Sequence, residues 1–243
     1  MIPTPDVAMV LAAGLGTRMR PLTDAKPKPL ITVAGKPLID YALDRFAAAG
    51  VRKVVVNVHY LADQVEDHMK TRDDLSIAIS DERAQLLETG GGLKKAEFLL
   101  GDDPIYCTNT DAILVDDGAA ECCARLAATF DPDAMDALLL LVPKNAATGY
   151  DGAGDFDLDA EQNLVRPDGT GAPFIFTGLQ LISPILLADA PSGPFSTRLL
   201  WDKAGSRGRL KGLVHDGRWM HVGDPDGLEL AENWFAQERA GEK

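Results

Sequence analysis

The residues that decide the fold are Val7-Ala-Met-Val-Leu-Ala-Ala-Gly-Leu-Gly-Thr-Arg-Met-Arg-Pro-Leu-Thr23, followed by Lys26-Pro-Lys-Pro-Leu30. The apolar run at the start predicts a buried strand, and Gly14 and Gly16 predict a tight turn directly after it. Four cations then follow within eleven residues: Arg18, Arg20, Lys26 and Lys28. Glycine lets backbone N–H groups approach an anion and cations neutralise it, so the segment predicts a phosphate-binding loop.

The composition bounds the class of protein. The chain has 243 residues, 46% of them hydrophobic and 25% charged, which is typical of a globular protein with a substantial core. A net charge of −13 argues against nucleic acid as a partner. No apolar run reaches the roughly 18 residues of a membrane span and no signal peptide is recognisable, so we predict no membrane partner and a cytoplasmic location. Three cysteines without metal-binding spacing are expected to be reduced: Cys107, Cys122 and Cys123.

Strand and helix patterns alternate through the first half of the chain. The expected strands are Val7–Ala12, Lys53–Val58, Leu75–Ser80, Ile105–Asn109 and Leu138–Val142. The expected helices between them are Pro37–Ala49, Leu61–Met69, Gly91–Leu99 and Asp116–Phe130. This alternation predicts an α/β fold with a mostly parallel sheet, buried on both faces by helices.

The pattern changes to α+β after about residue 145. We expect a hairpin of Gly154–Asp159 with Asn163–Arg166, a strand Pro173–Ile182, a second hairpin of Arg209–His215 with Arg218–Val222, and a final helix Asp226–Arg239. No linker separates the halves. The second half is therefore expected to extend the first sheet, within one domain spanning residues 1–243.

Three interpretations of the opening segment compete. A Walker loop requires Gly-x-x-x-x-Gly-Lys-Ser/Thr, which is absent. A dinucleotide-binding fingerprint, as in a nicotinamide-dependent reductase, requires a third glycine where Met19 stands, and Pro21 opposes an immediate helix. A glycine turn with merely solvated cations remains the structural alternative.

Further motifs favour a different phosphate-binding class. The stretch Gly14–Thr23 with Pro27-Lys-Pro-Leu30 resembles the signature of the sugar-1-phosphate nucleotidyltransferases. Four more segments follow in that family's order: Glu88-Thr-Gly-Gly-Gly92, Asn109-Thr-Asp111, Phe176-Thr-Gly178 and Trp219-Met-His-Val-Gly223. The run Leu87–Gly92 is most similar to the N-acetylmuramate-1-phosphate uridylyltransferases of peptidoglycan recycling.

The resemblance implies a Rossmann-like nucleotidyltransferase fold, in which residues 1–145 bind the nucleotide and a smaller α+β portion, residues 146–243, binds the sugar. It implies transfer of a nucleoside monophosphate from an NTP, UTP above all, to a sugar 1-phosphate, with release of pyrophosphate. An anionic phosphate must attack a phosphorus that is already surrounded by negative charge. Positioning and charge neutralisation therefore carry the catalysis, and no protein nucleophile is required.

The resemblance also assigns the catalytic residues. Arg18 matches the arginine that holds the triphosphate, Lys28 matches the lysine that contacts a phosphate in the transition state, and Asp111 matches an aspartate that binds Mg²⁺. Arg20 and Lys26 are left open between phosphate steering and surface charge. The nucleotide-binding residues would be Leu11, Ala12, Gly14, Gly16, Thr17, Gln85, Thr89 and Gly90.

The sugar and metal sites are assigned in the same way. The sugar-binding residues would be Asn109, Gly154, Arg166 and Thr177. The family's second Mg²⁺ aspartate is replaced here by His221, and imidazole is a poor Mg²⁺ ligand. The metal set therefore comprises Asp111 with Asp224 or His221, or Asp111 with water and substrate phosphates.

Two other functions remain open at this point. Within the enzyme class, the alternative is a mannose- or heptose-1-phosphate guanylyltransferase. In another class, His221 at the metal position allows a catalytically weak regulatory protein that binds nucleotide sugars. We expect a monomer or a small homo-oligomer.

Overall fold

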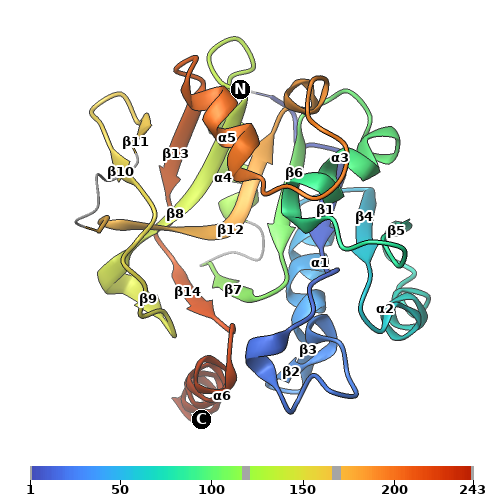
Figure 1. The fold of residues 1–243 in the computed structure, drawn as a ribbon. Coiled ribbons are helices and arrows are strands. Elements are labelled where there is room, and N and C mark those ends of the chain that lie inside the picture. The colour runs from blue at the N-terminus through green and yellow to red at the C-terminus, as the bar shows by residue number, and fades with distance from the viewer. Residues whose placement is uncertain (1, 117–120, 166–170, 242–243) are drawn as a thin grey trace.

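A seven-stranded sheet forms the centre of the computed structural model, which describes residues 2–116, 121–165 and 171–241 (Figure 1). The strand order is β13-β8-β12-β6-β1-β4-β5. The strand bounds are β1 Val7–Leu11, β4 Lys53–Val58, β5 Ser76–Asp81, β6 Ile105–Asn109, β8 Ala137–Pro143, β12 Phe174–Ile182 and β13 Leu210–Val214.

Most of this sheet is parallel. Strands β6, β1, β4 and β5 pair in parallel, as does β13 with β8, whereas β12 runs antiparallel to both β6 and β8. The predicted mixed, mostly parallel sheet is confirmed. Strands β12 and β13 come from the second half of the chain, which therefore extends the sheet as expected.

Helices cover both faces of the sheet because side chains alternate along each strand. On one face, Ala8 and Val10 of β1 pack in a core with α1 (Leu38–Ala48), α2 (Ala62–Met69) and α4 (Glu121–Thr129). On the other face, Met9 packs in a core with α3 (Glu88–Leu100) and α5 (Arg198–Gly205). The carboxyl ends of the parallel strands meet at one edge, where open α/β sheets bind ligands.

Smaller elements complete the fold. A three-stranded sheet contains β7 (Ala112–Val115), β14 (Arg218–His221) and β9 (Ala147–Thr148), and two short pairs are β2 (Thr32–Val33) with β3 (Lys36–Pro37) and β10 (Asp157–Leu158) with β11 (Leu164–Val165). The 3-10 turns are η1 (Thr17–Met19), η2 (Lys28–Leu30), η3 (Lys144–Ala146) and η4 (Pro184–Leu187). Helix α6 (Pro225–Gly241) packs beside β2 at one end of the molecule (Figure 1).

Two features differ from the sequence predictions. The hairpin of Arg209–His215 with Arg218–Val222 is wrong: β13 pairs with β8 in the central sheet, and β14 pairs with β7 and β9. Helix α3 begins at Glu88, so the glycine triplet lies inside it. A Cβ at Gly90 would lie 2.4 Å from the Phe195 ring, so glycine there permits close packing. The predicted first hairpin is confirmed as the β10–β11 pair.

Candidate active site

The glycine turn places the two leading cations. Gly16 has a φ of +62° and directly precedes η1, which carries Arg18. A Cβ at Gly16 would lie 3.0 Å from Cβ of Lys28 and 3.0 Å from Cγ2 of Thr23. The Thr23 hydroxyl donates a hydrogen bond of 2.8 Å to the Gly16 carbonyl. Glycine is therefore required at position 16 both by the backbone conformation and by the close approach of η2.

Lys28 and Asp111, which are distant in the sequence, form an ion pair. Lys28 Nζ lies 3.1 Å from Asp111 Oδ2, and the side chains are 11% and 26% exposed. Burial alone would raise the pKa of Asp111, but Lys28, followed by His221 and Arg18, holds that pKa below its usual value. Asp111 is therefore an ionised carboxylate beside two cations, Lys28 and Arg18.

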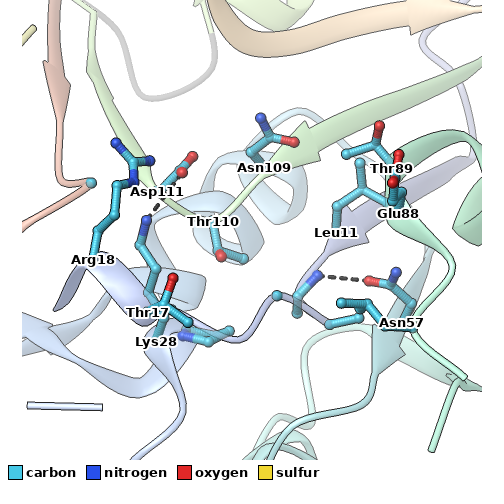
Figure 2. A pocket seen from close by; sticks show the side chains of 17 residues that line it. Leu11, Thr17, Arg18, Lys28, Asn57, Glu88, Thr89, Asn109, Thr110 and Asp111 are labelled. Carbon is cyan, nitrogen blue, oxygen red and sulfur yellow. Dashed lines mark hydrogen bonds and ion pairs between the residues drawn. The ribbon is translucent and has the colours of Figure 1, made fainter. Parts of the chain in front are cut away.

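These groups line a cavity of about 330 Å³ at the carboxyl ends of β1 and β6. Figure 2 shows Arg18 and the Lys28–Asp111 pair near one another, with Thr89 on the far side. Ten of the predicted site residues line the cavity: Leu11, Ala12, Gly14, Gly16, Thr17, Arg18, Lys28, Thr89, Asn109 and Asp111. The structure thus brings the predicted phosphate-binding and nucleotide-binding residues into one space.

A buried polar bridge supports this cavity, and the sequence analysis missed it. Asn57 Oδ1 accepts a hydrogen bond of 2.7 Å from the Ala12 backbone N–H, and Asn57 Nδ2 donates one of 2.7 Å to Glu82 Oε1 (the Ala12 bond is drawn in Figure 2). Glu82 Oε2 accepts a bond of 3.2 Å from Leu87 N. The bridge ties the turn after β1 to the start of α3. Asn57 stood out as a polar residue inside an apolar strand, and that was the available signal.

Two predicted nucleotide-binding residues do not line the cavity. Gln85 is exposed and its backbone N–H donates to the Glu82 carbonyl, while Leu86 and Glu88 line the cavity instead. Gly90 is buried, and its N–H donates to the Phe195 carbonyl. Base recognition by Gln85 stays a prediction for the nucleotide-bound protein.

A second cavity, of about 390 Å³, adjoins the first and shares Leu11, Thr89 and Asn109 with it. Gly154 lines this second cavity, as predicted for the sugar. Thr177 does not: its buried hydroxyl donates to the Leu140 carbonyl, which is a structural contact. Arg166 lies outside the described residues. Sequence reasoning missed the contribution of α5 and the residues before it, namely Ser196, Thr197, Arg198 and Trp201.

The metal ligands considered above do not gather around one point. Asp224 Oδ1 accepts a hydrogen bond of 2.9 Å from Gly227 N at the start of α6, and the His221 ring stacks on Trp219. Burial lowers the pKa of His221, so the ring is neutral near pH 7. Within the described part of the chain, no three His, Cys, Asp or Glu side chains form a metal-binding group. An ionised Asp111 at the phosphate-binding end still fits Mg²⁺, which uses one or two carboxylates with water and substrate phosphates.

An α/β fold with a cavity at the carboxyl ends of its parallel strands, lined by Arg18 and Lys28, is the arrangement expected of an enzyme that acts on a nucleotide. A family model described as nucleotidyl transferase matches residues 7–165. The chain therefore belongs to the nucleotidyl transferase family, and the predicted family and enzyme class are confirmed.

Two relatives are similar over nearly their whole length. The N-acetylmuramate alpha-1-phosphate uridylyltransferase of Caulobacter vibrioides is 47% identical over 243 residues, covering 98% of this chain and 100% of that protein. The protein of the same name from Neisseria meningitidis serogroup B is 38% identical over 229 residues, covering 93% and 96%.

A solved structure supports the fold. UDP-glucose pyrophosphorylase complexed with UDP-glucose superposes with a TM-score of 0.79 at 17% identity, over 98% of this chain and 100% of that chain. At this identity the likeness concerns the fold alone. None of the described helices combines the length and apolar character needed to cross a bilayer.

Proposed function

We propose that this protein transfers UMP from UTP to N-acetylmuramate 1-phosphate, giving the nucleotide sugar and pyrophosphate in peptidoglycan recycling. The observation that carries the proposal is the pair of adjoining cavities, one with Arg18, Lys28 and Asp111 and the other reached across Asn109. The full-length similarity to two uridylyltransferases of that substrate supports the choice of nucleotide and sugar.

The arrangement suits attack of a sugar phosphate on the α-phosphorus of a triphosphate. The sugar-phosphate oxygen forms a bond to that phosphorus while the bond to pyrophosphate breaks. Arg18 and Lys28 line the first cavity and would neutralise the charge on the phosphates, and a Mg²⁺ ion held by Asp111 would offset the remainder. No side chain needs to form a covalent intermediate.

The nucleotide and the sugar are tested together. Purified protein is assayed for pyrophosphate release with each of the four nucleoside triphosphates and a panel of sugar 1-phosphates, with and without Mg²⁺. We expect the highest kcat/KM for UTP with N-acetylmuramate 1-phosphate, and dependence on the metal. A preference for GTP with mannose or heptose 1-phosphate would instead support the guanylyltransferase alternative.

The regulatory alternative makes a separate prediction. It requires nucleotide binding without turnover in either Mg²⁺ or Mn²⁺. The presence of Arg18, Lys28 and Asp111 in one cavity and the full-length similarity to two uridylyltransferases argue against it. The need for UTP supports the predicted cytoplasmic location, and the expected monomer or small homo-oligomer is to be measured by light scattering.

A further inference from the structure

The second cavity contains a charge pair that phosphoryl transfer does not require. Among the described residues that line it, Asp155 and Arg198 are the charged ones. Arg198 Nη2 lies 4.0 Å from Asp155 Oδ1, and the side chains are 65% and 27% exposed. An exposed pair at this distance contributes little to stability, so stability alone does not account for Arg198.

Asp155 and Arg198 differ in how firmly the surrounding protein holds their side chains. Asp155 Oδ2 accepts a hydrogen bond of 3.0 Å from the Phe176 backbone N–H, which orients the carboxylate. The Arg198 guanidinium has no further side-chain partner among the described residues. Its fork of N–H donors matches a carboxylate in a bidentate manner. Arg198 is therefore available to a ligand, whereas Asp155 is anchored.

The backbone that carries Arg198 is fixed to the nucleotide cavity. Arg198 is the first residue of α5, and the preceding Thr197 N–H donates a hydrogen bond of 2.9 Å to Thr89 Oγ1. The N–H groups of Gly90 and Gly91 donate to the Phe195 carbonyl at 2.8 and 3.0 Å. Thr89 lines both cavities. A sugar with its phosphate in the first cavity would therefore meet Arg198 from a defined direction.

Charge explains why a cation is needed at this place. The chain carries a net charge of −13, and Asp155 adds a negative charge inside the sugar cavity. A neutral hexose would enter without electrostatic cost, whereas a sugar bearing a carboxylate would be repelled unless a cation offsets Asp155. Arg198 supplies that cation within the same cavity.

We propose that Arg198 binds a carboxylate on the sugar and so selects an acidic N-acylated hexosamine 1-phosphate over its neutral counterpart. The inference rests on the proposed function, since muramate differs from glucosamine by an ether-linked lactyl group that carries a carboxylate. Arg198 is thus a specificity residue, separate from the phosphate-binding residues of the first cavity.

The test compares two substrates that differ only in this group. kcat and KM are measured at saturating UTP with N-acetylmuramate 1-phosphate and with N-acetylglucosamine 1-phosphate, for the wild type and for Arg198→Gln, Arg198→Lys and Arg207→Gln. Arg207 is exposed just after α5 and lines neither cavity, so it controls for the loss of one surface charge.

We expect Arg198→Gln to lower the ratio of kcat/KM values, acidic over neutral sugar, by roughly 10- to 100-fold, mainly through KM for the acidic sugar. Arg198→Lys should keep part of the ratio, because the charge remains but the fork is lost. Arg207→Gln should keep the ratio of the wild type. An unchanged ratio in Arg198→Gln, or equal losses on both sugars, would overturn the inference.

A failure of the proposed function can be distinguished from a failure of the inference about Arg198. If the wild type releases pyrophosphate with neither sugar, the proposed function is contradicted, and calorimetric binding of the two sugar phosphates to the wild type and Arg198→Gln then decides the role of Arg198. Tighter binding of the acidic sugar that Arg198→Gln abolishes would support the inference. Equal binding of both sugars would overturn it.

Discussion

The Asn57→Asp substitution keeps the size of a buried side chain but replaces its one donor by an oxygen. In the native protein Asn57 is 2% exposed, and its Nδ2 donates a hydrogen bond of 2.7 Å to Glu82 Oε1. Glu82 is fully buried. The variant would place two carboxylates face to face at that distance. The acceptor that receives the Ala12 N–H is preserved, so the change is confined to the Glu82 side of the bridge.

The loss of stability depends on how the folded variant accommodates the two carboxyl groups: either both stay charged and repel one another, or one of them binds a proton. Two unit charges 2.7 Å apart, at an effective dielectric constant of about 20, repel by about 6 kcal/mol. Binding one proton between the carboxyl groups removes the repulsion and restores an O–H···O bond. Protonating a carboxyl group whose ordinary pKa is about 4 costs about 4 kcal/mol at pH 7. The folded variant therefore takes up a proton and loses about 4 kcal/mol of its free energy of unfolding at pH 7.

The pH dependence has a definite sign. In the variant, the pKa of the carboxyl pair is raised in the folded state and ordinary in the unfolded state. The stability deficit is therefore absent near pH 4 and grows by about 1.4 kcal/mol per pH unit as the pH rises, until the folded pair loses its proton. This stability deficit is measured by urea unfolding of the wild type and the variant at pH 5, 6, 7 and 8.

Asn163→Asp is the matched control. Asn163 Nδ2 donates a hydrogen bond of 2.7 Å to Asp159 Oδ2, so the two carboxylates would be equally close. Asp159 is exposed and Lys211 Nζ donates to Asn163 Oδ1, so water and a cation would screen the new charge. We expect a loss of at most about 1 kcal/mol with little pH dependence. A deficit for Asn57→Asp that is constant from pH 5 to 8, or equal to that of the control, would refute the reasoning.

Three further predictions follow from single residues. Lys28→Met should lower kcat by on the order of 100-fold or more in the pyrophosphate assay, whereas Lys95→Met on the exposed side of α3 should leave it unchanged. Gly16→Ala should lower the free energy of unfolding by about 1–2 kcal/mol, measured in urea, and should also reduce kcat/KM because the new Cβ meets Lys28. Gly35 has a φ of +84° but open space around it, so Gly35→Ala should lower the stability and leave kcat/KM unchanged. Burial lowers the pKa of His215 despite the nearby Asp116, so stability should fall as the pH drops from 7 to 5, and His215→Gln should flatten that fall in urea titrations.

The sequence predicted the individual strands and helices whose signal lies in neighbouring residues, but it did not predict every strand pairing. The strand Lys53–Val58 matched within its bounds because four valines mark it as buried. The β13–β14 hairpin failed because Asp216-Gly217 is a good turn signal in isolation. The pairing of β13 with β8 instead places Gly212 close to the side chains of Leu141 and Leu158, 2.8 Å from where a Cβ would lie. Such a tertiary contact is visible only in three dimensions.

The site was predictable where the residues belong to a motif and not where they act through tertiary contacts. Lys28 and Asp111 were assigned from the resemblance, and the structure brings them to 3.1 Å. Helix α5 has only eight residues, too few for a clear periodic signal, so Arg198 was not foreseen. Glu82 follows a strand, where a carboxylate is usually exposed, and its role became visible only from its burial and its hydrogen bonds with Asn57 and Leu87.

The Lys28–Asp111 pair also constrains how substrates would bind. These two groups neutralise one another inside the first cavity. Under the proposed function, Lys28 would share its three N–H donors between Asp111 and a phosphate. Asp111 would then lose part of the positive charge that offsets it, and a divalent ion would restore the balance. The triphosphate and Mg²⁺ would therefore favour one another's binding through this pair, and under the proposed function Asp111 would hold the ion without Asp224, which caps α6, or His221, which packs on Trp219.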